Sequence, residues 1–190
     1  MNKTILVDKN QHEGKHDLKH SYLQDHGYTL EFVRLYDKQD KDADYMFEGG
    51  KIVIDTKANI QELAGCLKGN MKRFREECKR THDKGLRLVI LTETEHIGEV
   101  ERIEDLADWR EPAREYQKRR RGYVASMKRA GKKPVVFLPM RIQGKFAKQI
   151  AQTAQTMMNE TERYNVSFEF CHPSETGQRI IDILESEDYV

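Results

Sequence analysis

The sequence contains no long hydrophobic run. No stretch of about 18 consecutive apolar residues occurs in the chain, and the first residues, MNKTILVDKN, pass from a short apolar run directly into charged side chains. We therefore expect neither a membrane-spanning helix nor a secretory signal, and the expected location is the cytoplasm. With 34% charged and 37% hydrophobic residues, the composition is that of a globular domain with a very polar surface.

Cysteine is scarce as well. Cys66, Cys78 and Cys171 are odd in number, lie far apart and include no C-x-x-C pair. This pattern argues against a disulfide framework and against a zinc site built from cysteines. We expect all three to be ordinary reduced thiols in or near the core.

Motifs of several common enzyme classes are also missing. No G-x-x-x-x-G-K-[ST] occurs, which argues against nucleotide hydrolysis, and HPSETG lacks the G-x-S-x-G turn of a serine nucleophile. We interpret Ser174 as a helix cap. His12, His16 and His20 recur every four residues, but Gly14 interrupts the first pair, so surface positions are favoured over a zinc site.

The net charge is close to zero, since 33 basic residues are balanced by 32 acidic ones, and the overall field predicts no partner. The distribution is uneven, however, and a segment at about residues 110–133 is strongly basic. A solvated helix face is one explanation; we interpret the segment as a helical insertion that contacts DNA phosphates. Its basic residues are Arg114, Lys118, Arg119, Arg120, Arg121, Lys128, Arg129, Lys132 and Lys133.

Hydrophobic periodicity predicts strands that alternate with helices. The expected strands are residues 4–7, 29–35, 44–47, 51–57, 86–93, 134–140 and 166–170. The expected helices are residues 16–28, 59–85 with a break at Gly69, 103–109, 110–134 with breaks at Gly122 and Gly131, 144–165 and 174–186. LRLVILTE is the most hydrophobic stretch and predicts a central strand buried on both faces. The pattern predicts one α/β domain over residues 1–190.

A β-hairpin is predicted where Gly49 and Gly50 separate two β-like runs. If these glycines form a two-residue turn, Asp44 lies opposite Asp55, and Lys57 projects from the same face of the sheet. Two opposed carboxylates favour a bound cation, and Mg²⁺ is commonly held by one or two carboxylates with water and phosphate. A metal-activated water beside an ammonium group suits phosphodiester hydrolysis. The alternative is that Asp55 and Lys57 are surface charges at a strand end.

The same stretches resemble the Pro-Asp … (Asp/Glu)-x-Lys signature, PD-(D/E)XK, of restriction-endonuclease-like nucleases. More narrowly, they are similar to the nuclease domain of XPF-type structure-specific DNA endonucleases. That family has V-D-x-R-E, G-D-Y/F and E-R-K followed by a helix with (D/E)-L, and here the corresponding stretches are LVDKNQ, ADY, IDTK and IQEL. LRLVILTE resembles the family's buried strand that ends in glutamate. The resemblance covers about residues 4–95 and, loosely, 166–184, and it implies a mixed central sheet flanked by helices.

The resemblance implies that Asp44 and Asp55 bind Mg²⁺ or Mn²⁺ and that Lys57 is the catalytic lysine. Two departures from the family pattern are visible. Asn10 and Gln11 stand where the family has arginine and glutamate, and Asp55 stands where it has glutamate. Aspartate is an allowed ligand in the wider superfamily, so we expect an active site.

The resemblance also implies supporting residues and a function. Asp8 matches the family's first acidic position, Glu62 a helical acidic position, and Arg73 an arginine near the scissile phosphate, with Arg75 as the alternative. The expected activity is metal-dependent cleavage of flap, fork, nicked or branched DNA by a stand-alone phage or bacterial nuclease domain of the DNA-repair type. Members commonly dimerise, so a homodimer is also expected. The alternative function is a catalytically inactive DNA-binding or assembly module with the same fold.

Overall fold

The computed structural model describes residues 3–9, 11, 14, 16–35, 43–134 and 140–186, and the structural statements below concern these residues. A six-stranded sheet has the order β2-β1-β3-β4-β5-β6. β3 is antiparallel to both of its neighbours, and the remaining pairs are parallel, so the sheet is mixed as predicted. The strands are β1 (Thr4–Asp8), β2 (Thr29–Val33), β3 (Tyr45–Phe47), β4 (Ile52–Lys57), β5 (Arg87–Glu93) and β6 (Val166–Cys171).

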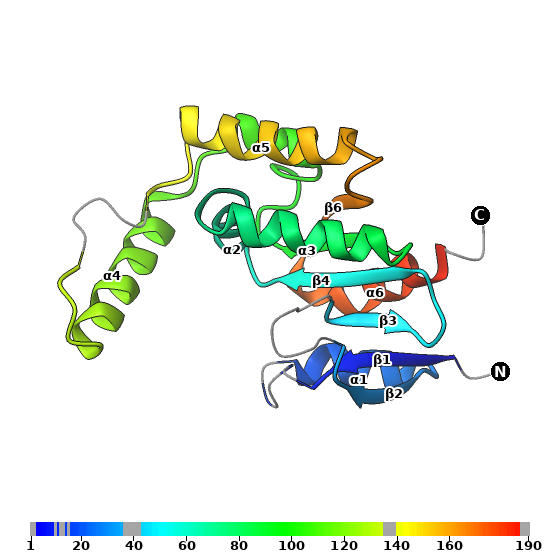
Figure 1. Ribbon diagram of the computed structural model, residues 1–190. Helices are drawn as coiled ribbons and strands as arrows, with labels where there is room; N and C mark the ends of the chain where they lie inside the picture. Colours follow the sequence, from blue (N-terminus) through cyan, green and yellow to red (C-terminus); the bar gives the residue numbers. More distant parts are fainter. Residues whose placement is uncertain are drawn as a thin grey trace.

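Helices cover both faces of this sheet, which confirms the α/β fold (Figure 1). α2, α3 and α5 pack on one face, and α1 and α6 pack on the other. The helical segments are α1 (Asp17–Asp25), α2 (Ile60–Ala64), the π-helical turn η1 (Gly65–Gly69), α3 (Met71–Asp83), the 3-10 turn η2 (Ile103–Ala107), α4 (Ala113–Arg129), α5 (Gly144–Asn159), the 3-10 turn η3 (Pro173–Glu175) and α6 (Thr176–Glu185).

β5 separates two hydrophobic cores. Leu88 and Ile90 belong to the core under α2, α3 and α5, whereas Val89 and Leu91 belong to the core under α1 and α6. Helices cover both faces of this strand, and parallel strands pair with both of its edges, which explains its continuous apolar sequence. The predicted burial on both faces is therefore confirmed, although β5 is the fifth of the six strands and lies next to the edge strand β6.

The β3–β4 hairpin has the predicted strand register but a different turn. Tyr45 pairs with Ile54, as a turn centred on the two glycines requires. The Gly50 N–H, however, donates to the Phe47 carbonyl, so Glu48 and Gly49 are the central turn residues. Gly49 has a φ of 75°, and Gly50 is not among the glycines with positive φ. A type I′ turn needs positive φ at both central residues, and this one has it only at Gly49.

Other predicted boundaries are corrected in the same way. The break before α3 is present, with η1 between the two helices. α4 runs through Gly122 without a break, because a single glycine costs only about 1 kcal/mol in a helix, and Gly131 with φ 67° follows its end. Ser174 lies inside η3 and does not cap α6; its N–H donates to the His172 side chain. The predicted strand 134–140 falls largely outside the described residues.

α4 projects from the side of the molecule (Figure 1). Within this 17-residue helix no side chain is buried. The other long helices each bury several apolar side chains against the sheet or its covering layer. The position of α4 therefore depends on the contacts at its base. No helix in the described ranges is long and apolar enough to cross a membrane.

Candidate active site at the end of strand β4

Buried charges are concentrated where β1 and β4 end. Asp8 is the last residue of β1, Asp44 directly precedes β3, and Asp55 and Lys57 lie in the last half of β4; all four are buried. β1, β3 and β4 are neighbours in the sheet, so these side chains come from adjacent strands. Burying an ion costs several kcal/mol unless partners compensate, so the partners of these four side chains decide what the cluster can do.

Asp55 and Lys57 form a buried ion pair on one face of β4. The Lys57 ammonium contacts Asp55 Oδ2, and the two residues are two positions apart on the strand, so both face α2 and α3. Burial alone would lower the pKa of Lys57, but the Asp55 carboxylate reverses the effect and holds the pKa above its usual value. Lys57 is therefore a charged donor at neutral pH.

A cavity of about 360 Å³ opens beside this pair. Glu62 and Arg73 line it together with Asp55 and Lys57, so the structure brings these predicted residues together. Arg75, the alternative to Arg73, is exposed and is not one of the lining residues. The cavity therefore brings carboxylates together with an ammonium and a guanidinium group.

Glu62 has a local role that the sequence did not predict. Its carboxylate accepts the Ala58 N–H at 2.9 Å, while its own N–H donates to Asn59 Oδ1 at 2.9 Å. The Asn59 side chain satisfies a backbone donor in the first turn of α2, and the Glu62 carboxylate satisfies one just before the helix. These bonds fix the chain directly after Lys57 and so support the end of β4.

Asp44 differs from the predicted geometry. The paired register of β3 begins at Tyr45, and the Asp44 N–H donates to the Ile54 carbonyl at 2.8 Å. Its carboxylate Oδ2 accepts hydrogen bonds from the Thr56 N–H at 2.9 Å and from Thr56 Oγ1 at 2.6 Å. The carboxylate thus contacts the residue after Asp55, and it satisfies a backbone donor of β4 next to the start of the short strand β3.

Asp8 lies next to Asp44 through the backbone. The Asp8 N–H donates to the Asp44 carbonyl at 3.0 Å, and the Gln11 N–H donates to the Asp8 carbonyl at 3.0 Å. The backbone of the predicted first acidic position is therefore bonded to the backbone of Asp44, and Asp8 does not line the Asp55–Lys57 cavity. Asn10, which precedes Gln11 in the first motif, falls outside the described residues.

Glu77 is a further buried carboxylate that the sequence analysis missed. It lies on α3 and lines the same cavity as Asp55 and Lys57. The buried residues of α3 are Phe74, Glu77, Cys78 and Thr81, spaced as one helix face. A glutamate on an otherwise buried stripe is the sequence signal that could have identified it.

A second polar cluster lies on the opposite face of the sheet, under α1 and α6. Lys19 Nζ is 2.6 Å from Glu93 Oε1, at the end of β5, and Thr176 Oγ1 donates to the same oxygen at 3.1 Å. His20 Nε2 is 3.2 Å from the Tyr45 hydroxyl. Burial, followed by the charges of Asp44 and Glu93, raises the pKa of Tyr45, which stays protonated.

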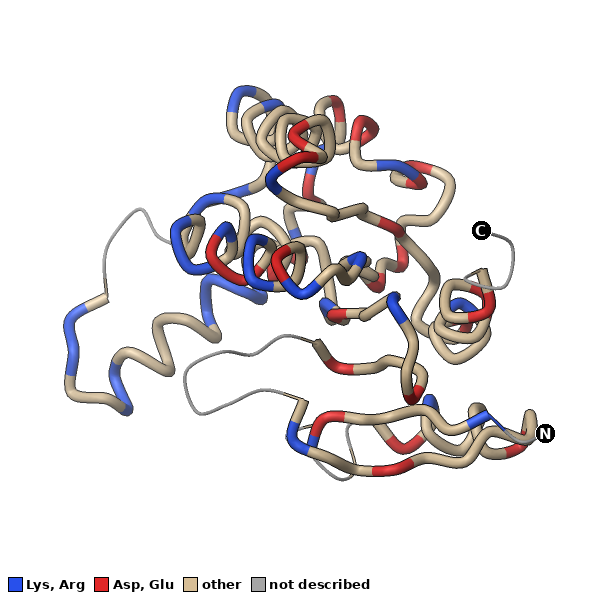
Figure 2. The backbone as a smooth tube through the Cα atoms, turned by 45° about the vertical axis from the view of Figure 1, so that its right-hand side comes forward, with Lys and Arg blue, Asp and Glu red and all other residues tan. Residues whose placement is uncertain are grey.

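The basic segment divides into two faces of α4. Arg114, Lys118, Arg121 and Lys128 are exposed and recur at helical spacing on one face. Arg119 and Arg120 are half-buried and lie off this stripe. Arg129, Lys132 and Lys133 extend the exposed charge past the end of the helix. Figure 2 shows Lys and Arg recurring along this projecting segment.

Arg119 belongs to a junction around the buried Glu111. Its Nε and Nη2 donate to the two Glu111 oxygens at 3.0 and 2.7 Å, and Nη2 also donates to the Met140 carbonyl at 2.7 Å. Glu111 further accepts from Gln61 Nε2 at 3.1 Å and from the Ile142 N–H at 3.0 Å. Arg119, for which the sequence predicts a DNA contact, thus forms an ion pair that anchors α4.

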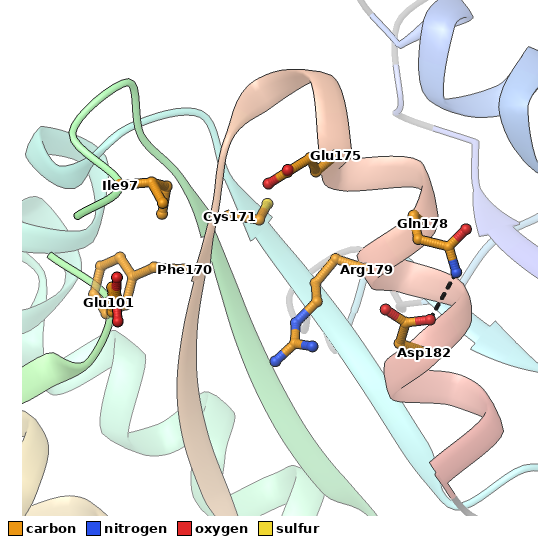
Figure 3. A pocket seen from close by; sticks show the side chains of 8 residues that line it. All are labelled: Ile97, Glu101, Phe170, Cys171, Glu175, Gln178, Arg179 and Asp182. Atoms are coloured by element: carbon orange, nitrogen blue, oxygen red, sulfur yellow. Dashed lines mark hydrogen bonds between the residues drawn. The ribbon is translucent and has the colours of Figure 1, made fainter.

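Another cavity of about 360 Å³ lies between β6, α6 and the loop after β5 (Figure 3). Arg179 pairs with Glu169 at 2.7 Å, and Gln178 donates to Asp182 at 2.7 Å. Residues predicted for the site do not line it. It lies apart from the Asp55–Lys57 cavity.

The residues at the end of β4 could supply only some of the ligands that a hard divalent cation needs. Within the described ranges, no group of three or more histidine, cysteine or acidic residues is arranged to hold a metal ion. Asp44 and Asp55 supply carboxylate oxygens, which Mg²⁺ and Mn²⁺ prefer, and Mg²⁺ sites commonly use one or two carboxylates with water and substrate phosphate.

Neither the protein-family models nor the curated proteins compared with this chain gave a match.

Proposed function

We propose that this protein is a Mg²⁺- or Mn²⁺-dependent endonuclease that hydrolyses phosphodiester bonds of structured DNA. The observation that carries the proposal is the burial of Asp8, Asp44, Asp55 and Lys57 on adjacent strands at one end of the sheet. Asp55 and Lys57 form an ion pair that lines a cavity, and a buried charge pair in a cavity is a common feature of catalytic sites. The preference for flap, fork, nicked or branched DNA rests on the resemblance to XPF-type nucleases.

Asp44 and Asp55 would hold the metal ion. When bound, the metal ion supplies an activated water and polarises the phosphoryl oxygens. Lys57 carries its proton at neutral pH and therefore acts as a donor to the developing negative charge rather than as a base. Arg73, exposed at the rim of the same cavity, binds a non-bridging phosphate oxygen.

The exposed face of α4 binds the DNA backbone away from the reacting phosphate. Arg114, Lys118, Arg121 and Lys128 form a row of charges along a projecting helix. Such a row attracts phosphates without reading sequence, and its contribution to affinity falls steeply with salt. Arg129, Lys132 and Lys133 extend the row.

A cleavage assay with matched variants tests this function. Purified protein is incubated with labelled flap, fork, nicked and plain duplex DNA in Mg²⁺ or Mn²⁺. Asp55→Asn and Lys57→Met are expected to lower the cleavage rate by roughly 100-fold or more, as loss of a transition-state contact does. The exposed residues Asp83 and Lys79 provide controls, and Asp83→Asn and Lys79→Met are expected to cut normally.

Two results would contradict the proposal. DNA binding by the wild-type protein without cutting in either metal would identify the inactive DNA-binding module instead. Equal losses in the site variants and in the exposed controls would show that the Asp55–Lys57 pair has no special role. Circular dichroism of each variant separates loss of activity from loss of fold.

A further inference from the structure

A cleft of about 630 Å³ lies at the foot of α4, away from the Asp55–Lys57 cavity. One wall is the α4 face that carries Tyr116, Gln117 and Arg120, which share a side of the helix by their spacing. The other wall is the segment that leads into α5 and includes Arg141 and Gln143. Its volume lies in the range of about 300–1,000 Å³ that is typical of small-ligand sites.

The lining chemistry matches one nucleotide. A tyrosine ring stacks on a base, guanidinium groups bind phosphate oxygens or stack on bases, and carboxamides pair with the edges of bases. The cleft combines Tyr116, Arg120, Arg141 and two glutamines. We propose that this cleft binds an unpaired nucleotide in a single-stranded segment of DNA. The choice of DNA rests on the proposed function, whereas the preference for an unpaired base rests on the lining.

The walls are fixed before any ligand arrives. The Arg119 guanidinium carbon lies 5.6 Å from the centre of the Tyr116 ring, and Arg119 donates two hydrogen bonds to the Glu111 carboxylate. Arg141 Nε donates to the Glu111 carbonyl at 2.7 Å. Both walls of the cleft are therefore tied to one buried residue, and little conformational freedom is lost on binding.

The same junction connects the cleft to the proposed catalytic strand. Gln61 donates to Glu111 and belongs to α2, the helix that follows β4 and Lys57. A single strand held at the foot of α4 is thus held by elements that are connected to α2 through Glu111. This placement suits DNA in which a single-stranded arm leaves a duplex near the cleavage position.

A binding assay without metal tests the cleft. Fluorescence anisotropy measures the Kd for a labelled 12-nucleotide oligothymidylate and for the same strand paired with oligoadenylate, in EDTA. Tyr116→Leu is expected to weaken binding of the single strand at least about fivefold, as loss of one stacked base does, and to change duplex binding less than about twofold. Tyr116→Phe keeps the ring and is expected to bind the single strand like the wild type.

Tyr123→Leu is the matched control. Tyr123 is also half-buried on α4, seven residues further along, but it does not line the cleft. Equal loss in both leucine variants, an equal loss on single strand and duplex, or no loss with Tyr116→Leu would overturn the proposal. Because no metal is present, the result is independent of cleavage. A Tyr116-dependent preference for single strands in a protein that cuts nothing would uphold the cleft and refute the nuclease.

Discussion

Replacing Arg119 by alanine is expected to destabilise the fold, although Arg119 stands in a run of three arginines. The Arg119 side chain is 24% exposed and makes two hydrogen bonds to the carboxylate of Glu111, whose side chain is 0% exposed. Removing one partner of a buried ion pair typically costs about 3–5 kcal/mol, because the other charge stays buried. Gln61 and Ile142 still donate to Glu111, which lowers the expected cost to about 2–3 kcal/mol.

Urea unfolding followed by tryptophan fluorescence measures this cost. Trp109 is the one tryptophan of the chain, is buried, and lies two residues before Glu111. With a slope of about 2 kcal/mol per M urea, the midpoint of Arg119→Ala is expected to fall by about 1–1.5 M. Arg121→Ala, on the exposed face, is expected to change the free energy of unfolding by less than about 0.5 kcal/mol.

A second substitution identifies the cause. Adding Glu111→Gln to Arg119→Ala removes the uncompensated buried charge, and part of the lost stability is expected to return. Equal midpoints for Arg119→Ala and Arg121→Ala would refute the junction. A double variant less stable than Arg119→Ala alone would show that the buried charge is not the source of the cost.

Two further predictions concern other parts of the fold. Burial and the Lys19 charge lower the pKa of His20 in the folded protein. Below about pH 6.5 the unfolded chain therefore binds a proton at this position more readily than the folded protein does. The free energy of unfolding consequently falls as the pH drops. In urea titrations at pH 7 and roughly pH 5.5, His20→Asn is expected to lose less stability than the wild type; an equal loss would contradict this role. A Cβ atom at Gly177 would lie 2.7 Å from a Tyr22 ring carbon, so Gly177→Ala is expected to destabilise by about 1–3 kcal/mol. A Cβ atom at Gly122, in the interior of α4, would meet no atom within 4 Å, so Gly122→Ala is expected to stabilise the fold by about 0.5–1 kcal/mol. Thermal melting temperatures that shift in the same direction for both glycine variants would contradict these two predictions.

Local patterns in the sequence predicted much of the sheet. The apolar run of β5 predicted a strand covered on both faces, and the symmetry about Gly49 and Gly50 predicted the pairing of β3 with β4. Both predictions depend on features that lie close together in the chain: side-chain alternation and a short loop. The turn itself was misassigned, because the backbone conformation of each glycine is not encoded in the dipeptide.

Contacts between distant residues were not predictable in the same way. Arg119 and Arg121 look equivalent in the run KRRRGY, and only the position of Glu111 and the return of the chain at Met140 distinguish them. The Asp44 contact with Thr56 depends on β3 beginning only at Tyr45, one residue after the position at which a longer ladder would have paired Asp44 with Asp55. Glu77 lies on the α3 stripe of Phe74 and Cys78, so its burial could be predicted from spacing, but its position in the cavity beside Asp55 could not.

The most direct test of the account is a titration of the protein with Mn²⁺ in an isothermal calorimeter. Wild-type protein and the exposed-residue control Asp83→Asn are expected to bind Mn²⁺ alike. Asp44→Asn and Asp55→Asn are each expected to abolish or strongly weaken this binding, because each removes a charged oxygen ligand from the proposed site. Retention of full Mn²⁺ binding by both site variants, or no binding by the wild type, would contradict the claim that these buried aspartates form a metal centre.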